Sequence, residues 1–226
     1  MSAEPTDAAP LLEVADLRTR YGRIQALHGV SLSVRRGSLV ALVGANGAGK
    51  TTLLRTISGV HRATSGTIVF DGKDITRASS DLRVRSGISQ VPEGRQVFGP
   101  MSVEDNLLLP AIALKLPADE RKRRLAEIYA LLPEVAALYK RPAGVLSGGQ
   151  GKMVALGRAL VAGTRYVLLD EPFQGLAPAL ALSYADALVR LRRSRPELGL
   201  LITESTPKLL DKIVDSALTI ERGEVS

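Results

Sequence analysis

The chain has 226 residues, of which 45% are hydrophobic and 23% charged, the balance of a globular protein with one or two domains. It contains no cysteine and only two histidines, which excludes disulfides, thiolate metal sites and a histidine-based metal centre. No apolar run approaches the roughly 18 residues of a membrane span, and residues 1–10 do not resemble a secretory signal. We therefore expect a cytoplasmic protein with a disordered tail at residues 1–10.

The net charge of +7 is compatible with nucleic acid, an anionic membrane surface or phosphorylated ligands. Basic side chains cluster in residues 121–124 and 190–195, both with helical periodicity. Solvated helix faces are the favoured interpretation, and contact with anionic lipid or nucleic acid is the alternative. Aromatic residues make up only 4% of the chain and tryptophan is absent, so few rings are available to stack on bases. We expect no nucleic-acid partner.

The first predicted element is an antiparallel hairpin. Strand-like runs at residues 11–21 and 30–34 flank a turn signal at Gly22 and Arg23. Tyr21 closes the first run, and its ring could stack on a nucleobase or pack across the hairpin. The sequence leaves both interpretations open.

The next element is a candidate phosphate-binding loop at residues 44–52, with the pattern Gly, four residues, Gly-Lys-Thr. The apolar run 39–43 before it is typical of a strand buried on both faces, and residues 53–57 after it share a helical face. Such a loop turns its amides toward phosphates, and the helix N-terminus adds positive charge. Lys50 would bridge the outer phosphates and Thr51 would hold magnesium. An ordinary glycine-rich turn is the alternative, which the flanking strand and helix disfavour. The predicted nucleotide contacts are Gly44, Ala45, Asn46, Gly47, Ala48, Gly49, Lys50, Thr51 and Thr52.

The middle of the chain changes from strands to helices. Residues 66–73 predict a short strand that ends in an Asp-Gly turn, and residues 83–90 lead to the polar residue Gln90. From residue 103 to about 139 the pattern is helical. Loop breaks are expected in the helical part at Pro110, Pro117 and Pro133. This predicts a helical insert within an α/β domain.

The insert ends at residues 146–150, Leu-Ser-Gly-Gly-Gln, and a helix with one apolar face follows. Ser147 can cap that helix, and Gly148 and Gly149 leave its first amides open to an anion. Ser-Gly-Gly is also common in linkers, which is the alternative.

A second buried strand, residues 166–172, ends in the carboxylates Asp170 and Glu171. Because side chains alternate along a strand, the two can face different atoms. One could approach magnesium through its water shell, and the other could orient an attacking water. An acidic pair at the N-terminus of a helix near Pro172 is the alternative.

The C-terminal part alternates strands with a helix. The pattern predicts a strand at residues 198–203 that ends at Glu204 and Ser205, a helix at 207–214, a strand at 217–220 and a turn at 222–223.

Over nearly the whole chain, the order and spacing of these motifs resemble the ATPase subunit of ATP-binding cassette (ABC) transporters. The resemblance implies an α/β P-loop NTPase fold of the ABC type, with a mixed sheet core, an N-terminal antiparallel β region and an inserted α-helical subdomain. Within an ABC ATPase domain at 11–226, it assigns 11–97 and 163–226 to a RecA-like core with a β subdomain and 98–162 to the helical subdomain.

The resemblance also implies ATP and Mg²⁺ as cofactors. Tyr21 would stack on adenine, residues 44–52 would be the Walker A loop, and Gln90 would sense magnesium and the γ-phosphate. Asp170 looks like the Walker B aspartate and Glu171 like the catalytic base. Residues 146–150 resemble the signature that binds the γ-phosphate held by the opposite subunit, and 173–178 the loop that links the two sites. The implied catalytic residues are Glu171, Lys50, Gln90 and Glu204, the magnesium ligands Thr51, Gln90 and Asp170, and the nucleotide contacts outside the loop Tyr21, Ser147, Gly148, Gly149 and Gln150.

This arrangement implies a head-to-tail dimer, homo- or heteromeric, that sandwiches two nucleotides, because neither half-site is complete in one chain. Its partners would be transmembrane permease subunits at the cytoplasmic face of the cell membrane, and indirectly a solute-binding protein. Residues 91–98 and 175–178 look like those of subunits that drive import of branched-chain amino acids, or of urea or amides.

Three departures from the family pattern bear on activity. The family usually places a histidine, and its branched-chain members often a glutamine, just after the strand that ends at Thr203, and the matching residue is taken to be Glu204. A carboxylate there would repel the γ-phosphate unless protonated or turned away, so weak or partner-dependent ATP hydrolysis is expected. Gly151 would loosen the first turn of its helix, and Phe173 replaces a small residue of the linking loop. Such features fit a heterodimer with one weaker site.

Three functions are therefore compared. In the first, ATP binding closes the dimer of an importer and residues 90–102 pass the motion to the permease. The second is a nucleotide-gated assembly subunit with little hydrolysis, which Glu204 and Gly151 favour and the intact carboxylates oppose. The third is a soluble non-transport ABC ATPase acting on DNA or ribosomes, which usually needs a coiled coil or a second cassette that 226 residues do not accommodate.

Overall fold

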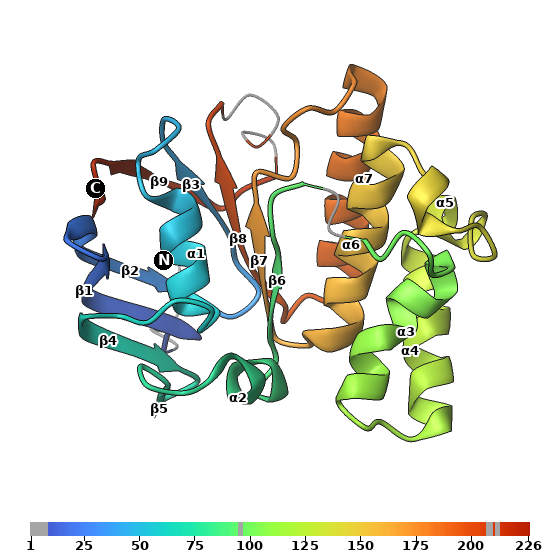
Figure 1. The fold of residues 1–226 in the computed structure, drawn as a ribbon, viewed down its shortest axis with the longest axis horizontal. Coiled ribbons are helices and arrows are strands. Elements are labelled where there is room, and N and C mark those ends of the chain that lie inside the picture. Colours follow the sequence, from blue (N-terminus) through green and yellow to red (C-terminus); the bar gives the residue numbers. More distant parts are fainter. Residues whose placement is uncertain (1–8, 95–96, 207–209, 211–212) are drawn as a thin grey trace, which may run out of the picture.

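The computed structural model describes residues 9–94, 97–206, 210 and 213–226. Two sheets stand side by side, with α1 between them and most of the other helices on the far side of the second sheet (Figure 1). Most of the helix predicted at 207–214 and most of the predicted N-terminal tail lie outside the described residues. In the part of the chain that is described, no helix combines the length and the apolar character needed to cross a bilayer.

The first sheet is the predicted N-terminal antiparallel region, with the order β2-β1-β4-β5. Its strands are β1 (Leu12–Tyr21), β2 (Ile24–Val34), β4 (Ser65–Phe70) and β5 (Lys73–Asp74). The hairpin is confirmed, but its second strand begins at Ile24 rather than at residue 30. The first half of β2 is mostly half-buried or exposed, so it lacks the apolar pattern that marks a strand in the sequence.

The second sheet is mixed, with the order β10-β9-β3-β8-β7-β6. Neighbouring strands from β9 through β3, β8 and β7 to β6 pair parallel, and β10 pairs antiparallel with β9. The register sets Asp170 opposite Thr203 and Val43 opposite Glu204. The carboxyl ends of β3, β8 and β7 therefore meet at one edge, where parallel α/β sheets bind ligands. The strands are β3 (Leu39–Val43), β6 (Ile88–Val91), β7 (Tyr166–Asp170), β8 (Gly199–Glu204), β9 (Ser216–Glu221) and β10 (Glu224–Val225).

Buried side chains alternate between the two faces of this sheet. On β3, Val40 and Leu42 belong to the core shared with the first sheet and α1, and Leu39 and Ala41 to the core shared with the other helices. Burial on both faces explains why β3 and β7 are continuous apolar runs in the sequence.

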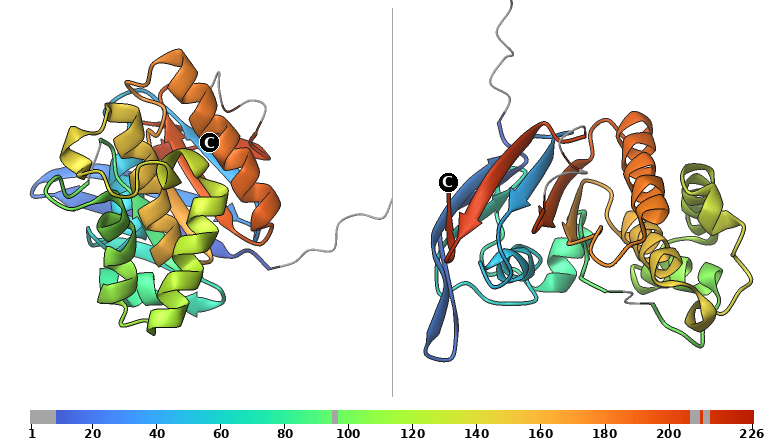
Figure 2. Two further views of the ribbon diagram at one scale, coloured as in Figure 1. Left: turned by 90° about the vertical axis from the view of Figure 1, so that its right-hand side faces the viewer. Right: turned by 90° about the horizontal axis from the view of Figure 1, so that it is seen from above.

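Helices α3 to α7 lie on the side of the second sheet away from α1 (Figures 1 and 2). The predicted helical insert is present, and breaks occur near Pro117 and Pro133. A break at Pro110 was expected, but α3 continues through it to Ala113. The burial of Leu107 and Ala111 against the helical core holds this turn despite the missing amide. The helices are α1 (Lys50–Ile57), α2 (Ser80–Arg85), α3 (Val103–Ala113), α4 (Ala118–Leu131), α5 (Pro133–Ala136), the 3₁₀ turn η1 (Ala143–Val145), α6 (Gly148–Ala162) and α7 (Pro178–Ser194).

The C-terminus of α1 is held by a buried arginine on α2. Arg83 is 3% exposed, and its guanidinium donates to the carbonyl oxygens of Thr56 and Ile57, both at 2.7 Å. It also donates to the carbonyls of Thr76 and Ala78. One side chain thus donates to four backbone carbonyls, two of them in the last turn of α1, which fixes this helix behind the phosphate loop.

Replacing Arg83 with methionine should lower the free energy of unfolding by about 2–4 kcal/mol, because buried carbonyls lose their donors. Arg85→Met, on the exposed side of the same helix, is the matched control and should change it by less than about 0.5 kcal/mol. Urea unfolding of both variants measures the difference, and equal effects would show that Arg83 does not anchor α1.

Candidate nucleotide site

The candidate phosphate loop connects β3 to α1 and requires glycine at defined positions. A Cβ on Gly44 would lie 2.3 Å from the carbonyl oxygen of Ile220, so no larger residue fits. Gly47 and Gly49 have φ of +82° and +111°, a region that side chains disfavour, and Gly49 is the N-cap of α1. The loop therefore presents the N-terminus of α1 to the cavity in front of it, as the sequence predicts.

Lys50 curls back over this loop. Lys50 is 3% exposed, and its ammonium donates to the carbonyls of Gly44 at 2.6 Å and Ala45 at 3.0 Å. It also lies 2.9 Å from Oε1 of Glu171, a buried ion pair. The loop and the end of β7, which are far apart in sequence, are thus joined by one charge pair.

Asp170 supports the predicted magnesium site. Its Oδ1 accepts hydrogen bonds from Thr51 at 3.1 Å and Thr203 at 2.9 Å. Its Oδ2 is buried without a hydrogen-bond partner. Burial raises the pKa of Asp170, and the two hydroxyls oppose the rise. An unpaired buried carboxylate oxygen beside a threonine hydroxyl fits Mg²⁺, which usually takes one or two protein ligands together with waters and phosphate oxygens.

Among the described residues no group of three or more histidine, cysteine and acidic side chains could hold a metal ion. A magnesium ion here would therefore depend on Thr51, Asp170 and the oxygens of a bound phosphate.

Glu171 occupies a constrained position at the end of β7. Its φ is +45°, the left-handed region that is uncommon for a residue with a side chain. Its amide donates to both the carbonyl and the hydroxyl of Thr203, each at 3.1 Å. Its carboxylate lies between Lys50 and the hydroxyl of Ser205, which donates to Oε1 at 2.9 Å. The side chain is thereby aimed at the phosphate loop.

The structure places Glu204 on the opposite side from the phosphate loop, contrary to our expectation. Ser205, one residue later, holds the expected position: its hydroxyl oxygen accepts a hydrogen bond from Nζ of Lys50 at 3.1 Å and lies 2.9 Å from Oδ1 of Asn46. Side chains alternate along an extended chain, so a shift of one residue reverses the side to which each points. Alternation was the signal that could have identified Ser205.

The Glu204 carboxylate instead supports the loop after β7. Its Oε1 accepts a hydrogen bond from the amide of Phe173 at 2.9 Å. The pKa of Glu204 is raised to about 7, chiefly by burial and also by the nearby charge of Glu171. The Phe173 amide and Lys152 act in the opposite direction. The expected repulsion between Glu204 and a phosphate therefore has no support in this arrangement.

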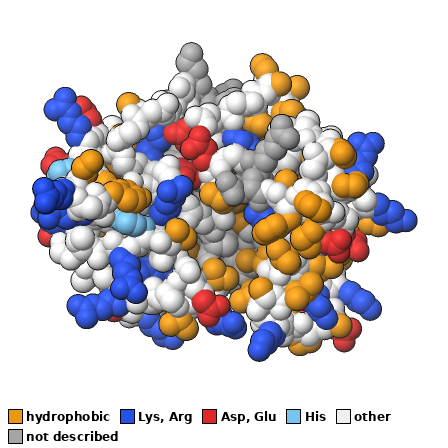
Figure 3. Space-filling view, in the orientation of Figure 1, with side chains coloured by type: hydrophobic (Ala, Val, Ile, Leu, Met, Phe, Trp, Pro, Cys, Tyr) orange, Lys and Arg blue, Asp and Glu red, His pale blue; other side chains and the backbone are white. Residues whose placement is uncertain are grey.

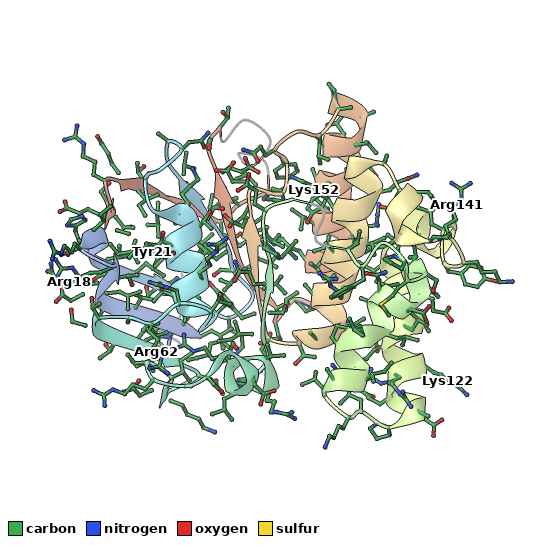
Figure 4. All side chains as sticks on the ribbon, in the orientation of Figure 1. Arg18, Tyr21, Arg62, Lys122, Arg141 and Lys152 are labelled. Carbon is green, nitrogen blue, oxygen red and sulfur yellow. The ribbon has the colours of Figure 1, made fainter. Side chains whose placement is uncertain are left out.

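Two predicted nucleotide contacts have partners of their own. The Oε1 of Gln90 accepts a hydrogen bond at 2.7 Å from Ser58, which follows α1. The ring of Tyr21 stacks on His61, with centroids 4.3 Å apart, and the tyrosine lies in front of α1 (Figure 4). Because 43% of Tyr21 is exposed, a base could still stack on it. Neither partner is recognisable from the sequence, because each comes from a distant part of the chain.

A cavity of about 560 Å³ lies in front of the loop. The hairpin strand β2 and the turn at Arg222 and Gly223 also border it, which the sequence did not indicate. No described residue of the motif 146–150 lines this cavity, since α6 lies across the sheet from α1 (Figure 1). The lining residues are Ile24, Gln25, Ala26, His28, Asn46, Gly47, Gly49, Lys50, Thr51, Thr52, Glu93, Glu171, Gln174, Arg222 and Gly223.

The second motif forms a capping box. The hydroxyl of Ser147 accepts the amide of Gln150 at 3.3 Å, and the Gln150 side chain accepts the amide of Ser147 at 3.0 Å. Gly149 is buried against Leu180, which leaves Ser147 exposed at the start of α6. This helix end thus faces away from the phosphate loop of its own chain.

Replacing Glu204 with glutamine should stabilise the protein above pH 7 and have little effect below about pH 5. The folded-state pKa lies above the ordinary value of 4.5, so the folded protein binds the extra proton and loses stability as the pH rises from 4.5 through about 7. This upward shift of the Glu204 pKa corresponds to at most about 3 kcal/mol in the free energy of unfolding. Unfolding measured at pH 5 and pH 8 tests it, with exposed Glu13→Gln as control. A pH-independent effect of Glu204→Gln would contradict it.

Comparison with known proteins identifies the family. The chain is 37% identical to the high-affinity branched-chain amino acid transport ATP-binding protein BraG of Pseudomonas aeruginosa, over 95% of this chain and 91% of BraG. It is 33% identical to the probable branched-chain amino acid transport ATP-binding protein LivF of Archaeoglobus fulgidus, over 96% and 90% of the two chains. The ADP conformation of MJ1267, an ATP-binding cassette of an ABC transporter, superimposes with a TM-score of 0.84 at 28% identity, over 97% of this chain and 90% of that one.

The family model described as ABC transporter matches residues 27–174, which include the phosphate loop, the motif at 146–150 and both carboxylates of β7. The α/β fold with an antiparallel N-terminal sheet and a helical insert agrees with that match. The chain therefore belongs to the ABC transporter family, as one of its ATP-binding cassette ATPases.

Proposed function

We propose that this chain is the ATP-hydrolysing motor of an importer for branched-chain amino acids or a related small solute. It works as a head-to-tail dimer on a membrane permease at the cytoplasmic face of the membrane, and a solute-binding protein supplies the permease. The convergence of Lys50, Asp170 and Glu171 at one cavity is the observation that carries this proposal. The similarity to BraG and LivF supports the choice of solute.

The Lys50–Glu171 pair is the resting form of the catalytic site. A triphosphate in the cavity brings a stronger anion to Lys50, so the ammonium leaves the carboxylate and binds the β- and γ-phosphate oxygens. The freed Glu171 then accepts a hydrogen bond from water and orients it for attack on the γ-phosphate. Thr51 and Asp170 would hold magnesium, which would supply positive charge to neutralise the transferring phosphate.

Gln90 contacts magnesium and the γ-phosphate only after it leaves Ser58, because the Ser58 hydroxyl donates a hydrogen bond to its side-chain oxygen at rest. Tyr21 offers its exposed face to adenine while His61 covers the other. Both residues thus keep the roles that the family resemblance implies, with resting partners that the nucleotide must displace or share.

The positions of the phosphate loop and of the motif 146–150 support the proposed dimer. Ser147 and the exposed start of α6 point away from the cavity of their own chain, and the cavity is open on its outer side. A second cassette in head-to-tail orientation brings its Ser147 end over the bound γ-phosphate, where helix amides bind an anion.

A separate groove is suited to the permease. A cavity of about 380 Å³ lies between α2, β6, α3 and α6, with Val84, Pro110 and Leu114 among its lining residues. Hydrophobic side chains gather on the half of the surface over the helices (Figure 3). Gln90 also borders this groove, so a partner seated there senses its movement. We also propose the subdomain boundaries at 97–98 and 162–163, and Ala162, at the second boundary, lines the groove.

One observation favours an alternative, a nucleotide-gated assembly subunit with slow hydrolysis. The side chain beside Lys50 and Glu171 is Ser205, which is shorter than the histidine or glutamine of the family. A serine hydroxyl holds Glu171 but reaches less far toward a γ-phosphate. ATPase turnover of the purified protein with and without its permease separates the two functions.

Replacing Glu171 with glutamine should lower ATP turnover at least ~100-fold, because an amide does not accept a proton from water. ATP binding should be retained or tightened, since Lys50 loses a competing carboxylate. Phosphate release and binding of a fluorescent ATP analogue measure the two effects. Turnover within a few-fold of the unmodified protein would remove Glu171 from the catalytic role.

Replacing Ser205 with alanine should lower turnover about tenfold, because Glu171 and Lys50 lose the hydroxyl between them. Glu204→Gln, one residue earlier, is the matched control and should change turnover by less than about twofold at pH 8, because glutamine keeps an oxygen that accepts the Phe173 amide. A larger loss from Glu204→Gln than from Ser205→Ala would reverse the assignment.

A further inference from the structure

Lys152 uses all its hydrogen-bonding capacity on one loop. The residue is 8% exposed, and its ammonium donates to the carbonyl oxygens of Glu171 at 3.0 Å, Pro172 at 3.1 Å and Gln174 at 2.6 Å. A lysine has three donor hydrogens, and the loop after β7 takes all of them. Figure 4 places Lys152 between α6 and the ends of the strands. A buried cation therefore binds the backbone of Glu171, the residue that carries the proposed catalytic carboxylate.

The contact matters because Glu171 is strained. A residue with a side chain in the left-handed region is strained and persists only when its surroundings hold it. Thr203 binds the amide of Glu171, and Lys152 binds its carbonyl, so the backbone is fixed on both sides of the side chain. Glu204 binds the Phe173 amide of the same loop. Without Lys152, the carbonyl side of this clamp is lost.

Lys152 also belongs to the helix that begins at the other half-site. It lies little more than one turn after Ser147, the N-cap of α6. A helix of this length moves as a rigid rod over such a short distance, so a shift of its first turn moves the ammonium as well. Lys152 thus connects two parts of the proposed dimer. One is the start of α6, which meets the nucleotide bound by the partner subunit, and the other is the loop that aims Glu171 at the nucleotide bound by its own chain.

We propose that Lys152 is a positioning residue that holds Glu171 and couples the two nucleotide sites of the dimer. When the start of α6 closes on the nucleotide of the opposite subunit, Lys152 pulls the loop 171–174 and sets the Glu171 carboxylate in its own site. This inference rests on the proposed ATPase function and adds a residue to which the proposed mechanism gives no other role.

The test compares Lys152→Met with Lys152→Arg and with Lys122→Met, an exposed lysine on α4 (Figure 4). Methionine keeps the approximate length of the side chain but removes its charge and its hydrogen-bond donors. Arginine keeps the charge and the donors. Each purified full-length protein is assayed for kcat, KM, the Hill coefficient for ATP, binding of a fluorescent ATP analogue and melting temperature.

We expect Lys152→Met to lower kcat about tenfold or more and to bring the Hill coefficient toward 1, while ATP affinity changes less than about twofold. Lys152→Arg should recover most of both losses, and Lys122→Met should match the unmodified protein. Binding stays intact because the phosphate loop does not touch Lys152. A role in stability alone would lower the melting temperature and leave kcat and the Hill coefficient of the folded fraction unchanged.

The proposal is overturned if folded Lys152→Met keeps its kcat and cooperativity, or if kcat and ATP affinity fall together. If Lys152→Met does not fold, Lys152→Gln, which keeps two donors without the charge, takes its place with the same criteria. Failure of the unmodified protein to bind or hydrolyse ATP would refute the proposed function instead. The two failures are therefore distinguishable.

Discussion

The buried ion pair between Lys50 and Glu171 is the contact on which the site depends. It joins the loop after β3 to the end of β7 across the intervening strand β8. Taking two charges out of water costs several kcal/mol each, and an ion pair recovers that cost only with good geometry and further hydrogen bonds. Here the carbonyls of the loop and the Ser205 hydroxyl provide those bonds. A pair that is costly to bury and easily displaced by a stronger anion suits a site that must exchange its ligand.

The surroundings of Glu171 are arranged to hold this pair in place. The parallel register brings Thr203 beside Asp170, so one threonine serves the hydroxyl contact of Asp170 and the amide of Glu171. Lys152 and Glu204 hold the loop after Glu171: Lys152 binds its carbonyls, and Glu204 binds the amide of Phe173. In the proposed mechanism the charged groups buried near the loop have separate tasks: Lys50 and Glu171 meet the nucleotide, and Lys152 and Glu204 shape the backbone that presents Glu171.

The sequence predicted those parts of the molecule that depend on local pattern. The phosphate loop, the buried strands and the pair Asp170 and Glu171 were recognisable because turn glycines, apolar runs and strand-end carboxylates are written in consecutive residues. Contacts made by tertiary packing were not recognisable, such as His61 against Tyr21 and Lys152 on the loop after β7. The misassignment of Glu204 for Ser205 arose because the strand was taken to end at Thr203, whereas β8 extends through Glu204.

The central claim is that one chain holds half of each nucleotide site and a second chain completes it. The protein has no cysteine, so a variant with Asn46→Cys in the phosphate loop and Ser147→Cys at the start of α6 carries only those two thiols. Disulfide formation between chains, measured in the Glu171→Gln background, tests the claim directly. The account predicts intermolecular cross-links between positions 46 and 147 with ATP and few without it. Equal cross-linking with and without ATP, or none in either case, would contradict it.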